Sequence, residues 1–144
     1  MALPFTDREL KNAWRNLSRA AESCSSLSGN NSKRLLLFYA IECGLKAVWL
    51  KRNGKSVFGS NEVQGVGHDI CKLAKEFHVS HDSRSLYCIK LPPVKENERS
   101  TPRDFGIKDL HQVWRYGGVC ESPSDDECEK QLLKLKTWIE QELK

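Results

Sequence analysis

The chain has no uninterrupted apolar run long enough to cross a membrane. Its longest apolar stretch is broken by Glu42 and Lys46, whereas a membrane-spanning helix needs about 20 predominantly apolar residues. The N-terminus also lacks the charged start, apolar centre and small-residue cleavage site of a secretory signal. We therefore expect a cytoplasmic protein that has no membrane partner.

The sequence also lacks the CxxC pairs from which many structural zinc sites and thiol redox motifs are built. Its six cysteines are Cys24, Cys43, Cys71, Cys88, Cys120 and Cys128. Three of them fall on apparent helix faces, where a free thiol packs as a small apolar side chain. A chain of 144 residues buries roughly two-thirds of its unfolded surface, so its core needs no disulfide or metal. We expect free thiols, no metal and no cofactor; His78, His81 and Asp82 could hold a metal but are more readily explained as loop residues.

The chain has no large excess of positive or negative charge, because its net charge is only +4 and its cations are interspersed with acidic residues. That pattern is more typical of a solvated surface than of a nucleic-acid footprint. One group of cations has few acidic neighbours in the sequence: Lys46, Lys51, Arg52 and Lys55. These four are candidate RNA-binding residues, and the alternative is that they stabilise the C-terminus of a helix.

Internal repeats, a glycine-rich phosphate loop and strand–helix alternation are all missing, which disfavours the doubly wound nucleotide-binding folds. Helical patterns dominate instead. Thr6 and Glu9 have the spacing of a capping box and start a helix that should reach Cys24 or Leu27. A loop rich in serine, asparagine and glycine follows at residues 25–31.

The next helix is the longest, with Ser32 as its expected N-cap and Gly54 as the glycine beyond its end. Its apolar face is wider than an ordinary surface stripe, so we expect it to be the central helix. Gly44 is costly inside a helix, which suggests that a neighbouring helix approaches closely there. The two helices should form an antiparallel hairpin.

The second half predicts shorter elements. Asp69 can cap a helix that runs through Phe77, and residues 54–67 before it form an expected flexible connection. Leu86–Leu91 could be a short extended piece ended by two prolines, and residues 94–104 are an expected exposed, flexible loop.

The chain should end in helices. A brief helix is predicted over Ile107–Trp114, followed by a turn at residues 116–118 and a last helix that starts with a second capping box, Ser124 with Glu127. The sum is an all-α bundle of four or five helices in a single domain, residues 1–144.

Three short motifs carry a family resemblance. They are Ala40–Ala47 (AIECGLKA), Gly67–Leu73 (GHDICKL) and Trp114–Tyr116 (WRY). They resemble the alanine-x-glutamate-x-x-leucine-lysine-alanine helix, the histidine-aspartate turn and the arginine-tyrosine signature of the HEPN superfamily, over roughly residues 32 to 143. The resemblance implies a HEPN-like helical fold and RNA-directed biology. Many members are metal-independent ribonucleases of toxin–antitoxin and antiviral systems, and others are non-catalytic helical partners.

The catalytic members of that family carry an arginine and, after four to six intervening residues, a histidine. The nearest pair here is Arg103 and His111, with seven residues between them, so the family motif is absent in its usual form. A catalytic role for this pair competes with a surface arginine and an ordinary helix histidine. His68 beside Asp69 is a further acid–base candidate, although capping by Asp69 and packing of His68 explain the pair better.

Arg115 and Tyr116 could contact an RNA phosphate and stack on a base, respectively. A structural role at a helix end is the favoured interpretation of this pair, because adjacent helical residues point in different directions.

Three functional hypotheses follow. The leading one is a HEPN-like subunit of a prokaryotic defence or toxin-type system that acts through a protein partner or as a homodimer, with RNA as an optional second partner. The first alternative is a metal-independent ribonuclease with a divergent active site. The second is a helical scaffold or oligomerisation module, for which the four tryptophans could supply an interface. Neither the partner-subunit hypothesis nor the scaffold hypothesis requires catalysis, so we lean towards a non-enzyme.

Overall fold

The computed structural model describes residues 3–24, 30–62, 70–77 and 89–144, and its fold is mostly helical with two small sheets. The helical elements are α1 (Asp7–Ser23), α2 (Asn30–Arg52), α4 (Ile70–Glu76), the 3₁₀ turn η3 (Ile107–Asp109), α5 (Leu110–Arg115) and α6 (Asp125–Glu142). The strands are β1 (Phe5–Thr6), β2 (Val57–Phe58), β3 (Ile89–Glu96) and β4 (Arg99–Phe105). No helix among these residues is long and apolar enough to span a membrane.

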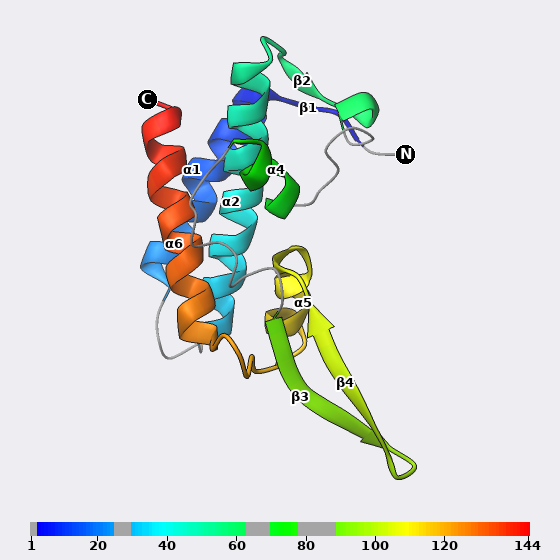
Figure 1. The fold of residues 1–144 in the computed structure, drawn as a ribbon. Coiled ribbons are helices and arrows are strands. Elements are labelled where there is room, and N and C mark those ends of the chain that lie inside the picture. The colour runs from blue at the N-terminus through cyan, green and yellow to red at the C-terminus, as the bar shows by residue number, and fades with distance from the viewer. Residues whose placement is uncertain (1–2, 25–29, 63–69, 78–88) are drawn as a thin grey trace.

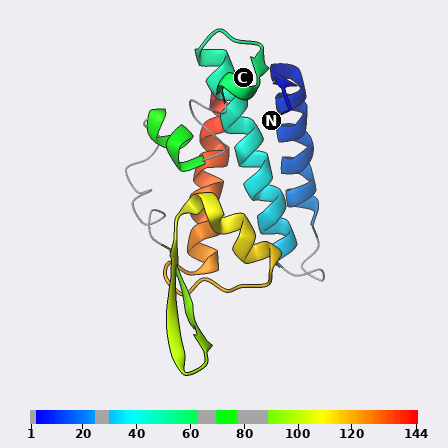
Figure 2. The same cartoon turned by 90° about the vertical axis from the view of Figure 1, so that its right-hand side faces the viewer.

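Helix α2 is the centre of the fold, as its wide apolar face predicted. It packs against α1, α4, α5 and α6 (Figures 1 and 2), and every residue from Gly44 to Leu50 is buried. Helix α1 runs antiparallel to α2 (Figure 1), so the expected helix hairpin is confirmed. Burial on several sides explains why α2 has no polar stripe of ordinary width.

Gly44 lies where α2 is closest to two other helices. A Cβ added at Gly44 would lie 2.8 Å from Cγ2 of Ile139 on α6 and 2.8 Å from Cε3 of Trp14 on α1. Real Cβ atoms do not approach other heavy atoms so closely, hence only glycine fits between these two side chains. The close approach predicted from the sequence is present, and it involves two neighbours.

The ends of α1 and α2 follow local capping chemistry. Thr6 Oγ1 accepts a hydrogen bond from the Glu9 N–H at 3.1 Å, and the Glu9 carboxylate accepts from the Thr6 N–H at 3.1 Å. This confirms the first capping box. Helix α2 begins at Asn30, so Ser32 lies inside its first turn and the predicted N-cap is wrong. The residue that precedes Asn30 lies outside the described part of the chain.

The C-terminus of α2 is a Schellman motif centred on Gly54. Gly54 has φ +62°, its N–H donates to the Lys51 carbonyl at 3.4 Å, and the Lys55 N–H donates to the Leu50 carbonyl at 2.9 Å. Glycine adopts this left-handed conformation at little cost. The predicted stop at Gly54 is confirmed.

The expected flexible loop over residues 94–104 is wrong, because most of it lies in an antiparallel hairpin of β3 and β4. The hairpin projects beyond the end of the helical bundle (Figure 1). Its turn residues Asn97 and Glu98 both have positive φ, at 50° and 67°, as the two-residue turns of hairpins require. Both strands are largely exposed, so they carry little of the apolar alternation that identifies a half-buried strand.

Prolines are a second reason why the sequence did not predict this hairpin. Pro92 and Pro93 were expected to end an extended piece, yet β3 continues through them with a register shift between Leu91 and Val94. Proline is tolerated at edge strands and irregularities because no ladder N–H is needed there. The expected flexible connection at 54–67 also contains β2, which pairs with β1; its residues 63–67 lie outside the described part of the chain.

The remaining helices largely match expectation. Helix α4 begins at Ile70, and its proposed cap Asp69 lies outside the described residues. η3 and α5 together cover the predicted helix 107–114, and Gly117, at φ +75°, turns the chain after it. Of the second predicted capping box, the bond in which Ser124 Oγ accepts from the Glu127 N–H is present at 3.2 Å. The Glu127 carboxylate, which was expected to bond back to Ser124, lies 3.6 Å from Lys130 instead.

Candidate functional site

A pocket of about 490 Å³ lies where α2, α4, η3 and α5 meet. We call it the His111 pocket. Its lining residues are Phe38, Tyr39, Glu42, Lys72, Lys108, Asp109, His111 and Arg115. Five of these eight side chains are of types charged at neutral pH, and His111 adds an imidazole, so the pocket is strongly polar.

His111 and Arg115 belong to the same face of α5 because they are four residues apart. The imidazole of His111 packs against aromatic rings, with centroid distances of 5.1 Å to Phe38 and 6.3 Å to Tyr39. Its buried Nδ1 has no hydrogen-bond partner among the described residues. The ring is therefore oriented by packing against α2.

Arg115 is fixed at the rim of the pocket by Tyr39. Its Nη2 donates a hydrogen bond to the Tyr39 hydroxyl at 2.5 Å. This hydrogen bond, followed by one with Tyr116, raises the pKa of the guanidinium above its usual value, so Arg115 is cationic at every physiological pH. A guanidinium has five N–H donors, and those that Tyr39 does not use can bind oxygen atoms of an anion.

The pocket has a small positive charge overall. Lys72, Lys108 and Arg115 are three cations against the two carboxylates of Glu42 and Asp109, which gives a net charge of +1 when His111 is neutral. Glu42 also pairs with Lys46, from whose Nζ its Oε1 lies 3.2 Å. The arrangement combines anion-binding donors with groups that can accept or release a proton.

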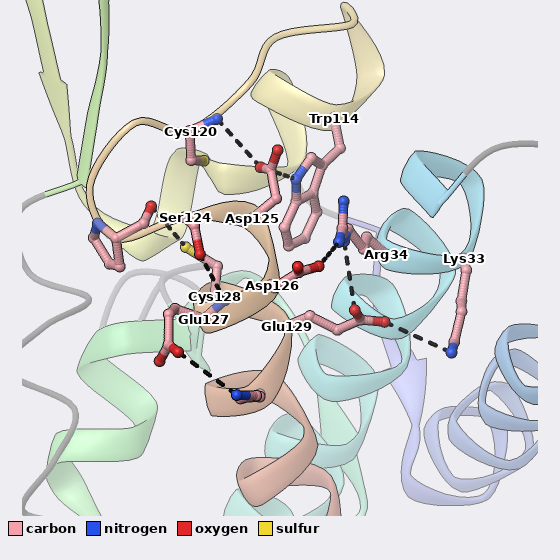
Figure 3. Close-up of polar contacts among 12 residues, drawn as sticks. Lys33, Arg34, Trp114, Cys120, Ser124, Asp125, Asp126, Glu127, Cys128 and Glu129 are labelled. Atoms are coloured by element: carbon pink, nitrogen blue, oxygen red, sulfur yellow. Dashed lines mark hydrogen bonds and ion pairs between the residues drawn. The ribbon is translucent and has the colours of Figure 1, made fainter.

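Helix α5 is held in place by a polar network at the start of α6 (Figure 3). One carboxylate oxygen of Asp125 accepts from the Trp114 indole N–H at 2.9 Å and from the Cys120 N–H at 3.3 Å. Trp114 is only 2% exposed, so its N–H depends on this partner. The network fixes the helix that carries His111 and Arg115.

The same end of α6 is tied to the start of α2. Arg34 is buried, and its Nη2 lies 2.6 Å from Asp126 while its Nε lies 3.6 Å from Glu129 (Figure 3). Lys33 adds a contact of 3.7 Å to Glu129. The start of α6 therefore contacts both α5 and α2, and these contacts hold α5 in place relative to α2.

Arg103 does not share the His111 pocket. It lies on β4, where its Nε donates to the Pro92 carbonyl at 2.9 Å, and it lines a second pocket that we call the hairpin pocket. The lining residues there are Leu91, Pro102, Arg103, Asp104, Phe105, Asp109, Gln112, Val113, Tyr116 and Gly118. The predicted pairing of Arg103 with His111 is thus not assembled in one pocket, and His68, the third catalytic candidate, lies outside the described residues.

The expectation of a basic face with few acidic neighbours is wrong in three dimensions. Lys46 is buried, with its ammonium 3.2 Å from Glu42 and 5.4 Å from the centre of the Phe58 ring. Lys55 lies 3.4 Å from Glu62 and 5.4 Å from the centre of the Trp49 ring. Both cations stabilise the fold around β2.

The other two cations of that group bind the end of α6. Lys51 donates to the Glu142 carbonyl at 2.6 Å, and Arg52 pairs with the Glu142 carboxylate at 3.2 Å. The Arg52 guanidinium also lies over the rings of Phe77 and Trp138, 5.0 and 5.3 Å from their centres. Their acidic partner is distant in the sequence, so sequence spacing gave no sign of it.

Of the predicted RNA-binding residues, Arg115 lies in the His111 pocket, and its neighbour Tyr116 lines the hairpin pocket. Sequence reasoning missed Tyr39, Glu42, Lys72, Lys108 and Asp109 as pocket residues. Two local signals were present: His111 and Arg115 are spaced by four, and Tyr39 and Glu42 are polar interruptions spaced by three on an apolar helix. Nothing local indicates that these two helix faces meet.

The five described cysteines are free, and Cys88 lies outside the described residues. Burial, followed by the nearby Glu42, raises the pKa of Cys43 to about 11, so its thiol stays protonated. Within the described ranges no group of three His, Cys, Asp or Glu side chains could hold a metal ion; His78, His81 and Asp82 fall outside those ranges.

Comparison with known proteins gives no relative. No family model, no curated protein and no solved structure matches this chain.

Proposed function

We propose that this chain is a HEPN-like helical subunit of a prokaryotic defence or toxin-type system that binds RNA in the His111 pocket and works with a protein partner. One observation carries the proposal. Glu42, Lys72 and Arg115 come from the three separate motifs of the HEPN resemblance, and all three line this one pocket. The packing of α4 and α5 on the central helix α2 thus brings residues of all three motif segments to one pocket, which supports the proposal.

The chemistry of the pocket supports a phosphodiester as its ligand. Arg115 and the two lysines offer charge-assisted hydrogen bonds, which are the strongest that a phosphate oxygen can accept. The excess of cations in the pocket favours an anionic ligand such as a phosphodiester. The Tyr39 ring adds planar surface of the kind on which RNA bases stack.

We expect Arg115→Ala to weaken binding of single-stranded RNA by roughly 10- to 100-fold, since hydrogen bonds to a charged group contribute about 1.5–3 kcal/mol. Fluorescence anisotropy with a labelled RNA at fixed salt measures the effect. Arg99→Ala is the matched control: it removes the same charge from the tip of the hairpin, away from the pocket. Equal and small losses in both variants would show that RNA meets only a diffuse positive field, and would remove the pocket from the proposal.

Metal-independent RNA cleavage is a second candidate, favoured by His111 and Arg115 on the same face of α5. In such a reaction a base removes the proton of the 2′-hydroxyl, the 2′-oxygen attacks the adjacent phosphorus, and the 5′-oxygen leaves with a proton from an acid. Imidazole can serve as base or acid near neutral pH, and a guanidinium stabilises the charge that develops on the phosphate. Glu42 and Asp109 could provide the complementary proton transfer.

If the protein cleaves RNA, His111→Ala should abolish cleavage in EDTA while RNA binding changes by less than about threefold, because Arg115 and the lysines remain. Incubating a mixed RNA pool with wild type, His111→Ala and His68→Ala, followed by gel analysis, makes the comparison. Equal cleavage by wild type and His111→Ala would assign the activity to other residues or to a contaminant. A wild type that binds RNA but leaves it intact would reject cleavage and retain the binding function.

A further inference from the structure

The hairpin pocket adjoins the His111 pocket at α5, and Asp109 lines both. On α5, His111 and Arg115 line the His111 pocket, whereas Gln112, Val113 and the C-cap residue Tyr116 line the hairpin pocket. A ligand longer than one nucleotide could therefore occupy both pockets by passing over a single short helix. We propose that the hairpin pocket is the base-recognition subsite for RNA whose phosphodiester lies in the His111 pocket, and that guanine is the base it prefers.

Tyr116 stands at the crossing between the pockets. Its side chain is 77% exposed, and its ring centre lies 6.0 Å from the Arg115 guanidinium. An exposed tyrosine beside a phosphate-binding arginine has the two parts of a single-strand site, a stacking platform and a backbone anchor. The base that follows an Arg115-bound phosphate would stack on Tyr116.

The hairpin pocket lacks the excess of cations found in the His111 pocket. Arg103 is balanced by Asp104, Asp109 is a carboxylate shared by both pockets, and the Nε of Arg103 is already bonded to the Pro92 carbonyl. Such a pocket disfavours a phosphate but accepts N–H donors from an uncharged base. The two pockets therefore suit the two chemically different parts of one nucleotide chain.

The walls fit a flat heterocycle. Leu91, Phe105 and Val113 provide apolar surface, while Asp104 and Gln112 provide hydrogen-bonding groups, in a pocket of about 630 Å³. This volume is within the usual range for small-molecule sites. Guanine is the RNA base with two adjacent donors on its Watson–Crick edge, N1–H and the N2 amino group, and a carboxylate accepts both at once. This inference rests on the proposed RNA-binding function.

The test is fluorescence anisotropy with U-rich single-stranded 10-mers that carry one central guanine, adenine, cytosine, uracil or abasic site. We expect the guanine oligomer to bind tightest. Tyr116→Ala should weaken it by roughly tenfold or more, the usual effect of removing a stacking side chain, and should leave the abasic oligomer within about twofold. Asp104→Asn should abolish the preference for guanine, whereas Glu98→Gln, which removes one negative charge at the hairpin turn, should preserve it.

Equal binding of all five oligomers, or a guanine preference that survives Asp104→Asn, would overturn the inference. If Arg115→Ala still weakened all five, the proposed function would stand without it. Absence of binding to any oligomer would reject both. If Tyr116→Ala instead converted a dimer into a monomer without changing base preference, the face would belong to a second copy of the chain, and the base subsite would be rejected.

Discussion

Gly44→Val is expected to lower the free energy of unfolding by more than 3 kcal/mol, a large part of the roughly 5–15 kcal/mol that a domain possesses. The new Cβ would lie 2.8 Å from both Ile139 and Trp14, so α1 and α6 would both have to move away from α2. Overpacking a core typically costs about 1–3 kcal/mol, and here two contacts are overpacked by a β-branched side chain that cannot rotate away. Urea unfolding followed by circular dichroism measures the loss.

Ala20→Val provides the control for this experiment. Ala20 is exposed on α1, so the same β-branched side chain in a helix should cost less than about 0.7 kcal/mol there. Gly44→Ala should fall between the two, because its gain in helix propensity of about 1 kcal/mol offsets part of the clash. A Gly44→Val protein as stable as Ala20→Val would contradict the close packing of the three helices.

Asp125→Ala should destabilise the protein by about 2–3 kcal/mol. It removes the partner of the buried Trp114 indole N–H, and an unsatisfied buried donor costs about 1–3 kcal/mol. It also removes an acidic residue from the first turn of α6, which contributes a few tenths to 1 kcal/mol through the helix dipole. Thermal and urea unfolding give the stability.

Two further variants separate these contributions. Glu127→Ala removes an acidic residue from the same turn without touching Trp114, so it should show the dipole effect together with the few tenths of a kcal/mol of the exposed Glu127–Lys130 ion pair. In a Trp114→Phe background the buried donor is gone, and Asp125→Ala should then cost at least about 1 kcal/mol less. Equal costs in both backgrounds would mean that the Trp114–Asp125 hydrogen bond contributes nothing to stability.

Local chemistry explains which parts of the fold were predictable. The Thr6–Glu9 capping box, the stop at Gly54 and the turn at Gly117 each depend on a few neighbouring residues. The central position of α2 followed from the width of its apolar face, and the role of Gly44 from the cost of glycine inside a helix. These features were read correctly because their causes lie within one or two turns of chain.

The hairpin shows the converse. Its strands β3 and β4 are mostly exposed, so they do not need alternating apolar and polar residues. Their three prolines also gave the segment the composition of a loop. The prediction that the cations at the end of α2 have few acidic neighbours was wrong for a related reason. Lys51 and Arg52 bind Glu142, which is remote in the sequence. The family resemblance likewise paired Arg103 with His111, although the two residues line different pockets.

The sequence by itself determined the helical class, most helix ends, the central helix and the small residue at its closest packing, because these depend on backbone preference and hydrophobic periodicity. Only the tertiary structure decided which charged residues remain at the surface, which pair with distant partners, and which share a pocket. Glu42, Lys72 and Arg115 meet in one pocket because α2, α4 and α5 pack together. That packing is a property of side chains from the whole chain, and no local pattern encodes it.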